Sequence, residues 1–386
     1  MGERVIVASA SIRSALGSDK RAIANSLLAA EGRAEVLELE NFGGRDYLYY
    51  PIKDAPSLRQ GGRLLSLLDD CVEEALLASS LSPEQLQDAA LFLGSSSFDI
   101  GDEELRLQRE LKSDTGASPL PRSYCGDLAQ HLAQRFSIRG GTHTFNTACT
   151  SSANALLYAM HAVRSGRLAT ALVVGVECFN LTTLAGFDSL QLLSRDQYRP
   201  FDLNRSGLVL GEGIGAVVVA SSGQVSIDAE WGDVVILGGS SGCDPKGMTC
   251  SSAESMAQVM EGALNSAGIG SDDVALLKAH ATGSESNDAA EAAAMRIQFK
   301  QRIPDCTSIK GALGHTLGAS GIVELIALLS CLRSGRIPST LGFSVEDEQL
   351  GFSPLREARI FAGGPVMLNY FGFGGNNNSL ILELES

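Results

Sequence analysis

Four segments of the chain combine residue types that can carry out covalent chemistry. The first is FNTACTSS, residues 145–152, in which Cys149 precedes an alanine-rich helical pattern. Unpaired backbone N–H groups and the positive end of the helix dipole both favour a thiolate at such a position. The pattern therefore predicts that Cys149 is a nucleophile near neutral pH. A small buried cysteine that fills a strand–helix junction is the alternative.

The second segment is KAHATGSESND, residues 278–288, in which His280 follows an apolar strand and precedes a polar turn. A side chain at the end of a rigid strand can project into a cleft, so His280 is a candidate acid–base group. A solvated histidine in a surface loop is the alternative. Asp288 begins an alanine-rich helical stretch, which predicts a helix N-cap.

The third segment is SIKGALGHTLGASG, residues 308–321, where small residues surround Lys310 and His315. Such small side chains let a ligand or another loop approach the backbone closely. Glu324 follows among apolar residues of the next helical stretch, and a carboxylate there needs a partner. We expect it to pair with Lys310. A phosphate-binding loop is disfavoured because the lysine precedes the glycines.

The fourth segment is NYFGFGGNNNS, residues 369–379, in which glycines alternate with aromatic residues. This pattern predicts a tight turn that presents Phe373 and free backbone N–H groups, which can act as oxyanion donors. A purely structural glycine-rich hairpin is the alternative.

Short β-branched runs and alanine-rich stretches of helical periodicity must position these segments. Apolar strands with helices between them are typical of strands buried on both faces, which predicts a mainly parallel α/β architecture. The expected strands are residues 5–9, 90–94, 171–176, 215–220, 233–238, 274–279, 366–371 and 380–385.

An internal repeat divides the chain. Residues 149–167 and 318–336, offset by 169, share one apolar helix stripe and end in the same Arg-Ser-Gly-Arg. Gly166 and Gly335 are placed to close the two helices. We therefore predict two duplicated α/β halves, residues 1–225 with the cysteine and residues 226–386 with the two histidines and the lysine.

The composition excludes several classes of function. The chain has 386 residues and 30 Lys+Arg against 45 Asp+Glu, a net charge of −15, which disfavours nucleic acid or an anionic membrane as the main partner. No apolar run approaches the ~18–20 residues that span a bilayer, and the N-terminus does not resemble a signal peptide. The eight cysteines form no CxxC pair, so we expect no metal site and no disulfides, and a cytoplasmic protein.

Taken together with PFDLNRSGLVLGEG, residues 200–213, the four segments resemble the signature of β-ketoacyl-acyl-carrier-protein synthases. Their order and spacing agree with that family, a member of the thiolase superfamily. The resemblance covers essentially the whole chain, is most specific from residue 143 onward and is weakest over 96–125. It implies the thiolase-like fold, a five-layer αβαβα body with two duplicated halves.

The resemblance also implies a reaction, a decarboxylative Claisen condensation between an acyl thioester and malonyl-carrier protein. Cys149 would carry the acyl group, and His280 and His315 would promote decarboxylation of the malonyl thioester. Lys310, paired with Glu324, would orient and charge-balance the histidines.

Further roles follow from the same resemblance. The backbone N–H groups of Cys149 and Phe373 would form the oxyanion hole, with Phe373 as a gate. Thr282 and Ser284 match positions that bind the phosphopantetheine arm, and Phe187 lies near the acyl pocket. Ala281, Ser284, Asn376 and Gln191 depart from the usual family residues, which leaves substrate choice and carrier docking open.

The implied partners are an acyl-carrier protein and a second subunit, in a homodimer or in a heterodimer with a ketosynthase-like chain. No resident cofactor is expected, because phosphopantetheine arrives on the carrier. The pathway is left open between fatty acid, type II polyketide and aryl polyene. An acidic carrier requires a local basic patch, for which the candidates are Arg195, Arg199, Arg205, Lys300 and Arg302.

Two other members of the superfamily are weaker alternatives. A thiolase needs a second cysteine in its C-terminal glycine-rich loop, whereas that loop here is FGFGGNNN. A chain-length factor, the non-catalytic partner in polyketide systems, lacks the nucleophile that Cys149 supplies.

Overall fold

The computed structural model describes residues 3–32, 34–39, 45–113, 124–224, 231–244, 252–300 and 302–385. Its centre is a ten-stranded sheet in the order β11-β10-β14-β15-β9-β1-β8-β6-β4-β5. One half of this sheet comes from each half of the chain. The N-terminal strands are β1 (Val5–Arg13), β4 (Ala90–Gly94), β5 (Thr142–Phe145), β6 (Thr170–Glu177) and β8 (Gly213–Ser221). The C-terminal strands are β9 (Val234–Cys243), β10 (Leu276–Lys278), β11 (Asp305–Thr307), β14 (Val366–Phe371) and β15 (Asn376–Leu384).

Both halves have the same topology. Each half has five strands, which we number by their order along the chain. From the β1–β9 junction outward, the strands of each half lie side by side in the order first, fifth, fourth, second, third. The two halves meet where Ile6 of β1 pairs with Val235 of β9. The predicted boundary between residues 225 and 226 lies outside the described residues, so its position stays a prediction.

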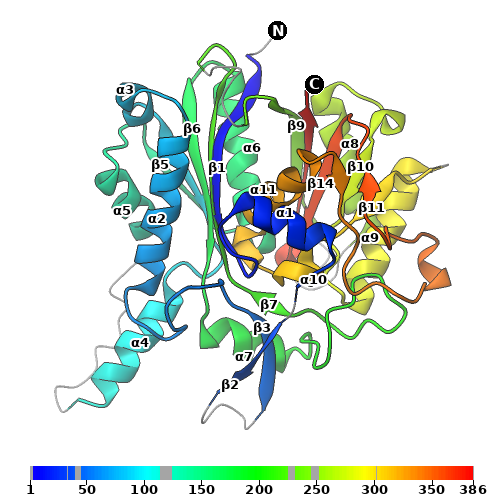
Figure 1. The fold of residues 1–386 in the computed structure, drawn as a ribbon, viewed down its shortest axis with the longest axis horizontal. Helices are drawn as coiled ribbons and strands as arrows, with labels where there is room; N and C mark the ends of the chain where they lie inside the picture. The colour runs from blue at the N-terminus through cyan, green and yellow to red at the C-terminus, as the bar shows by residue number, and fades with distance from the viewer. Residues whose placement is uncertain are drawn as a thin grey trace.

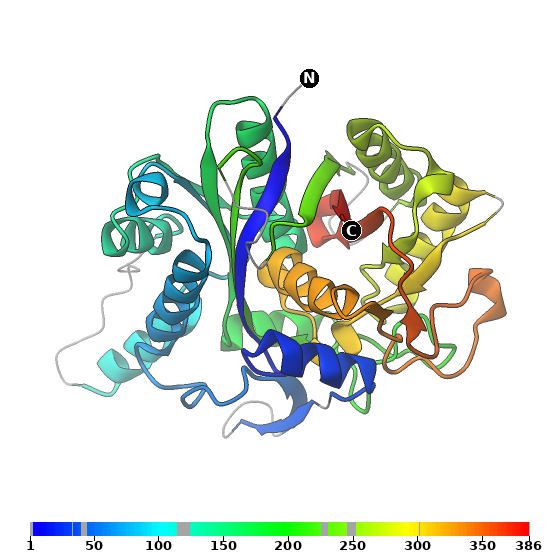
Figure 2. The ribbon, with the colours of Figure 1, turned by 45° about the horizontal axis from the view of Figure 1, so that its top comes forward.

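Helices cover and separate the two halves of the sheet, and Figures 1 and 2 show five layers. The central layer consists of α6 (Ser151–Arg164) and α11 (Ser320–Leu332), with α1 (Lys20–Leu28) beside α11. Outer layers are formed by α2 (Arg63–Ala78) and α5 (Asp127–Arg135) on the N-terminal half, and by α8 (Ala253–Ala267) and α9 (Glu285–Phe299) on the other. The expected αβαβα architecture is confirmed.

Smaller elements surround this body. The short helices are α3 (Pro83–Gln87), α4 (Ile100–Leu111), α7 (Leu181–Ser189) and α10 (Lys310–Leu313). A three-stranded sheet contains β2 (Glu35–Glu38), β3 (Asp46–Tyr50) and β7 (Leu210–Gly211), and β12 (Arg336–Ile337) pairs with β13 (Arg359–Ile360). Among the described residues, no helix has the length and apolar character needed to cross a membrane.

All eight expected strands are present, but the prediction of a mainly parallel sheet is wrong. In each half the last strand lies between the first and the fourth and runs antiparallel to both, as β8 does between β1 and β6. The equivalent strand β15 is antiparallel to β9 and β14. The outer strands β4, β5, β10 and β11 keep the expected parallel pairing. Apolar runs report burial on both faces and do not report strand direction.

The two central helices are the repeat found in the sequence. α6 begins at Ser151 and α11 at Ser320, 320 − 151 = 169 residues later, and each follows a short 3₁₀ turn. They cross closely at Gly321, where a Cβ atom would lie 2.2 Å from the backbone nitrogen of Ala153. Side chains of both helices and of both halves of the sheet form one apolar core. This shared core joins the two halves into one body.

Candidate active site

Cys149 lies in the turn that joins β5 to α6. The preceding residue, Ala148, has a positive φ of 52°, which bends the chain sharply before the helix. The side-chain amide of Asn154 donates to Thr147 Oγ1 at 2.9 Å, and that of Asn378 donates to Asn154 Oδ1 at 2.9 Å. The turn is therefore held in place from the C-terminal half of the chain. Cys149 is 4% exposed.

His280 follows the end of β10 and is fully buried. Glu291 of α9 accepts the backbone N–H groups of His280 and Ala281, both at 2.7 Å, so this carboxylate fixes the chain at the histidine. Ala281 has a φ of 51°, a left-handed conformation that costs a non-glycine residue free energy. The helix α9 begins at Glu285 after Ser284, so the prediction that Asp288 is the N-cap is wrong. Asp288 lies in the first turn of α9 instead. Its buried carboxylate accepts the backbone N–H of Gly283 at 3.0 Å, which ties the helix to the turn that precedes it.

Lys310, His315 and Glu324 come from the segment that leads into α11. The Lys310 ammonium pairs with Glu324 Oε1, as predicted, and both side chains are at most 1% exposed. His315 Nδ1 accepts the backbone N–H of Leu317 at 3.3 Å. In the neutral ring the proton therefore lies on Nε2, which can donate a hydrogen bond.

These segments bring the cysteine and the two histidines together. One ligand atom each of Cys149, His280 and His315 lies within 4.8 Å of the others. The two imidazole rings are nearly perpendicular, with centroids 5.3 Å apart. Among the described residues, neither ring nitrogen of His280 has a hydrogen-bond partner. A buried group with unused hydrogen-bonding capacity is available to a substrate.

Burial sets the protonation states of these groups. It lowers the pKa of His280 and of His315 well below the usual value, and the nearby Lys310 ammonium acts in the same direction. Both imidazoles are therefore neutral at pH 7. Burial raises the pKa of the Cys149 thiol to about 11, although the backbone N–H of Phe373 and the charge of Lys310 oppose it. In the free protein desolvation therefore favours the thiol over the thiolate, opposite to the effect expected from the backbone N–H groups.

The same three ligand atoms have the composition of a metal site, since cysteine and histidine are the ligands that zinc prefers. The charges around them argue against a cation. Two ammonium groups, those of Lys310 and Lys278, lie in the same buried region and share the single carboxylate of Glu324. Lys278, Lys310 and Glu324 together carry a net positive charge, which disfavours a cation beside them.

Phe373 closes the glycine-rich turn between β14 and β15. Gly374 and Gly375 have φ values of 78° and 75°, which suit glycine. The Phe373 ring packs against Phe187 of α7, with centroids 5.7 Å apart, and both rings are half-buried. Two residues assigned separate roles from the sequence are therefore in contact.

Thr282 and Ser284 lie on the turn after His280. Their hydroxyl groups are 3.0 Å apart, and Thr282 is 7% exposed. Ser284 lines a cavity of about 510 Å³, which is also lined by Gln191, Leu192, Arg205, Ser206, Gly207, Glu285, Ser286 and Ala289. The two hydroxyls therefore lie between the buried His280 and the cavity that Ser284 lines.

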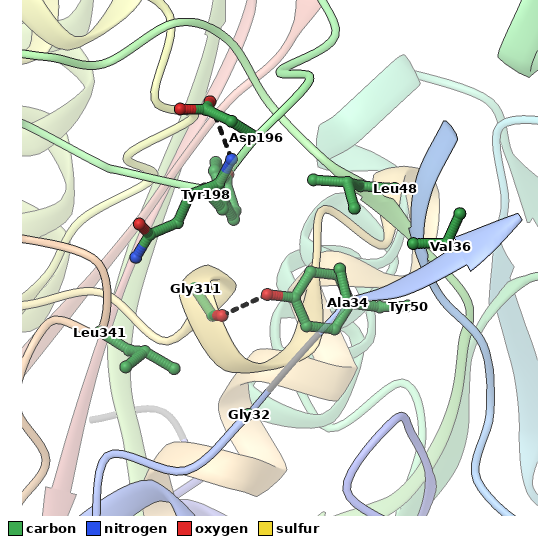
Figure 3. Close-up of a pocket in the computed structure, with 10 residues that line it drawn as sticks. Gly32, Ala34, Val36, Leu48, Tyr50, Asp196, Tyr198, Gly311 and Leu341 are labelled. Atoms are coloured by element: carbon green, nitrogen blue, oxygen red, sulfur yellow. Dashed lines mark hydrogen bonds between the residues drawn. The ribbon is translucent and has the colours of Figure 1, made fainter. Parts of the chain in front are cut away.

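Two tyrosines brace the backbone next to the site. Tyr50 donates its hydroxyl hydrogen to the carbonyl of Gly311, next to Lys310, at 2.6 Å. Tyr198 donates to the carbonyl of Ala281, next to His280, at 3.1 Å. Figure 3 shows both rings at a pocket of about 320 Å³, whose lining does not include Cys149, His280 or His315. This pocket borders Gly311, next to Lys310, and Tyr198, which contacts the residue after His280.

Three buried charged residues around the site were not singled out from the sequence. Lys278 donates a hydrogen bond to Glu324, and Glu291 accepts the backbone N–H of His280. Glu177, at the end of β6, accepts the backbone N–H groups of Ser96 at 3.0 Å and Gly318 at 2.9 Å. Charged residues at the ends of buried strands are the signal that could have identified Lys278 and Glu177.

Comparison with known proteins identifies the family. The model of the β-ketoacyl synthase N-terminal domain matches residues 53–224, and that of the β-ketoacyl synthase C-terminal domain matches residues 234–344. Together the two matches cover more than half of the chain.

Two curated relatives illustrate the range of similarity. The chain is 26% identical over 407 residues to 3-oxoacyl-[acyl-carrier-protein] synthase 1 of Escherichia coli, covering 99% of each chain. It is 31% identical over 281 residues to a putative mitochondrial 3-oxoacyl-[acyl-carrier-protein] synthase of Schizosaccharomyces pombe, covering 66% of this chain and 64% of that protein. The second match therefore spans less than two thirds of the relative.

Solved structures agree with the fold. A β-ketoacyl synthase from Burkholderia phymatum is 27% identical, covers 100% of both chains and has a TM-score of 0.84. The ishigamide ketosynthase/chain length factor is 24% identical over 100% of both chains, with a TM-score of 0.88. With both domain models matched in order, the chain belongs to the β-ketoacyl synthase family.

Proposed function

We propose that the chain is a ketosynthase that condenses an acyl thioester with malonyl-acyl-carrier protein. The observation that carries this proposal is the buried cluster of Cys149, His280 and His315, whose ligand atoms lie within 4.8 Å of one another. A thiol and two neutral imidazoles, without a resident cofactor, are sufficient for acyl transfer and decarboxylation.

The first half-reaction transfers the acyl group to the enzyme. The Cys149 sulfur attacks the acyl thioester, the carbon–sulfur bond to the carrier breaks, and the carrier thiolate leaves with the thiol proton. The backbone N–H groups of Phe373 and Cys149 both approach the Cys149 sulfur closely enough to lower its pKa. The same two donors would stabilise the oxyanion that forms beside this sulfur.

The second half-reaction forms the carbon–carbon bond. The malonyl thioester loses CO₂, and the electron pair of the broken bond becomes an enolate whose oxygen accepts hydrogen bonds from His280 and His315. The enolate carbon attacks the acyl group on Cys149, which releases the β-ketoacyl thioester and a thiolate that takes up one proton. Neutral imidazoles are suitable donors because they stabilise the enolate without protonating it fully.

The cavity at Ser284 is the proposed path of the phosphopantetheine arm, with Thr282 and Ser284 as hydrogen-bonding residues and Phe373 as the gate. Arg195, which is exposed, lines a neighbouring pocket of about 220 Å³ and offers positive charge to an acidic carrier, whereas Arg45 in the same lining lies 3.9 Å from Asp188. The prediction that Arg205 belongs to a basic patch is wrong, because its side chain is 6% exposed and pairs with Asp347 at 2.7 Å. Arg199 is likewise paired, with Asp196 at 2.8 Å.

A covalent adduct tests the nucleophile. After incubation with acyl-carrier protein, intact-mass measurement should show one acyl group on the wild type and on Cys125→Ala, an exposed cysteine that serves as the control. The adduct should be absent from Cys149→Ala. An unchanged adduct in Cys149→Ala would contradict the proposal.

We also propose that the chain acts as a dimer, either with itself or with a ketosynthase-like chain. Among the described strands β5 ends the sheet, with a partner on one side only, and its first three residues are exposed. Tyr158 of α6 packs against Phe145 of this strand and is 55% exposed, a large apolar side chain beside an open strand edge. Mass photometry of the purified chain should show a dimer, and Tyr158→Glu should weaken it. A monomer would favour the heterodimer instead, which is tested by co-expressing this chain with a ketosynthase-like chain.

A further inference from the structure

The buried site contains a second lysine that the reaction above does not use. Lys278 is the last residue of β10 and is fully buried. Its ammonium group donates to Glu324 Oε2 at 2.5 Å, while Lys310 holds Oε1 of the same carboxylate. Because side chains alternate along an extended chain, Lys278 and His280 lie on the same face. The lysine is therefore directed toward the layer that contains the catalytic groups.

The charges around Lys278 do not cancel. Its environment consists of Glu324 on α11, Lys310 on α10, Glu291 on α9, Tyr370 on β14 and the neutral His280. Burial raises the pKa of Glu291 to about 7, so this group carries only part of a negative charge at neutral pH. Burial by itself would raise the pKa of Glu324, but the two ammonium groups outweigh it and lower the pKa, so Glu324 is ionised.

An aromatic ring supplies the remaining stabilisation of the lysine. The Lys278 ammonium lies 3.7 Å from the centroid of the Tyr370 ring, a cation–π contact. The Tyr370 hydroxyl donates to the carbonyl of Gly321 at 3.0 Å, which fixes the ring. Burial lowers the pKa of Lys278 to about 8, so most of the group stays charged at pH 7.

We propose that Lys278 is a positioning residue of the condensation site: by holding the second oxygen of Glu324, it gives the buried Lys278–Glu324–Lys310 cluster a net positive charge beside the two histidines. This inference rests on the proposed function. The positive cluster disfavours imidazolium at His280 and His315, so both rings stay neutral. It also favours the enolate, whose oxygen gains negative charge only as CO₂ leaves.

The test changes the charge of the cluster and then restores it. Lys278→Met removes one positive charge, and Lys278→Met/Glu324→Gln returns the cluster to a net charge of +1. Lys53→Met, at an exposed lysine, is the matched control. The titration of His280 and His315 is followed by NMR, which is practical because the chain has five histidines. Malonyl-thioester decarboxylation gives kcat and KM as functions of pH.

The expected results distinguish charge from shape. Lys278→Met should raise the titration midpoints of both histidines by about one pH unit. It should also lower kcat about tenfold at pH 7, with KM within about twofold, because the enolate loses one nearby positive charge. The double variant should return the midpoints toward those of the wild type. Circular dichroism should show a native fold for Lys278→Met, because Glu324 keeps Lys310 as its partner and methionine fills the space.

Two outcomes would overturn the proposal. Midpoints in Lys278→Met within about 0.2 pH units of the wild type would show that its charge does not reach the histidines. A shift that the double variant fails to reverse would show that Lys278 acts through its shape. If Lys278→Met does not fold, Lys278→Gln is titrated in the same way and judged by the same criteria. The histidine titrations need no substrate, so they decide this proposal even if the condensation itself is not observed.

Discussion

Ala148 and Leu317 lie 317 − 148 = 169 residues apart and adopt the same left-handed backbone conformation, with φ values of 52° and 43°. Each is the first residue of the 3₁₀ turn that leads into a central helix. Cys149 follows in one copy and Gly318 in the other. The duplicated turn therefore supplies the proposed nucleophile in one half and a residue without a side chain in its counterpart.

We predict that the two turns are not interchangeable. A Cβ atom on Gly318 would lie 2.3 Å from the backbone nitrogen of Ser96, so Gly318→Ala should lower the free energy of unfolding by about 1–3 kcal/mol. Urea denaturation measures the change. Gly126→Ala is the matched control, because a Cβ there has no neighbour within 4 Å. Equal stability of the two variants would contradict the close approach.

His315 should be needed for decarboxylation and not for acyl transfer. His315→Ala removes the Nε2 donor, and loss of one such donor costs about 10²–10³ in rate. We expect CO₂ release from the malonyl thioester to fall by this factor, while the acyl adduct on Cys149 still forms. His315→Gln, which keeps an N–H donor near the Nε2 position, should recover part of the rate. Undiminished CO₂ release by His315→Ala would remove this role.

Alkylation of the free enzyme should report the burial of the nucleophile. Because burial raises the pKa of Cys149 to about 11, its reaction with iodoacetamide should accelerate about tenfold per pH unit between pH 7 and 10. The rate is the loss of acyl-adduct capacity with time, with wild-type enzyme incubated without iodoacetamide as the background. A plateau below pH 8 would indicate a thiolate in the resting enzyme instead.

Glu291 gives a pH dependence of stability with a defined sign. Burial raises its pKa to about 7 in the folded chain, so between the ordinary value of 4.5 and pH 7 the folded state binds more protons than the unfolded state. The stability that this group contributes is present below pH 4.5 and is lost as the pH rises through 7. Urea unfolding at pH 5, 6 and 7 should therefore show the advantage of the wild type over Glu291→Gln decreasing. An advantage that grows with pH would contradict the shift.

The sequence was sufficient for features that depend on local pattern. The repeat offset of 169 locates both central helices, and Glu324 in an apolar helix stripe correctly predicts its pairing with Lys310. Features that depend on tertiary surroundings were missed. Lys278 pairs across 46 residues with Glu324, a contact that no local pattern encodes. Burial also governs the thiol of Cys149, because a helix dipole is worth about 0.3–1 kcal/mol at an exposed site, less than full burial costs.

The strand β5 shows a different limit of sequence reasoning. Its residues Thr142–Phe145 contain a single apolar side chain, Phe145, and the strand lies at the edge of the sheet, where no continuous apolar run is needed. The family resemblance supplied the reaction and the site residues, whereas residue patterns alone left a structural cysteine and a surface histidine open.

The site lies across the two halves of the chain. Cys149 belongs to the N-terminal half, and His280 and His315 belong to the C-terminal half, so neither half alone contains the cluster. Gly318 stands at the counterpart of Cys149, so the second copy of the turn offers no thiol. The cluster therefore exists only while the two halves are packed together, and a change that shifts one half against the other would disable it without altering any of its three side chains.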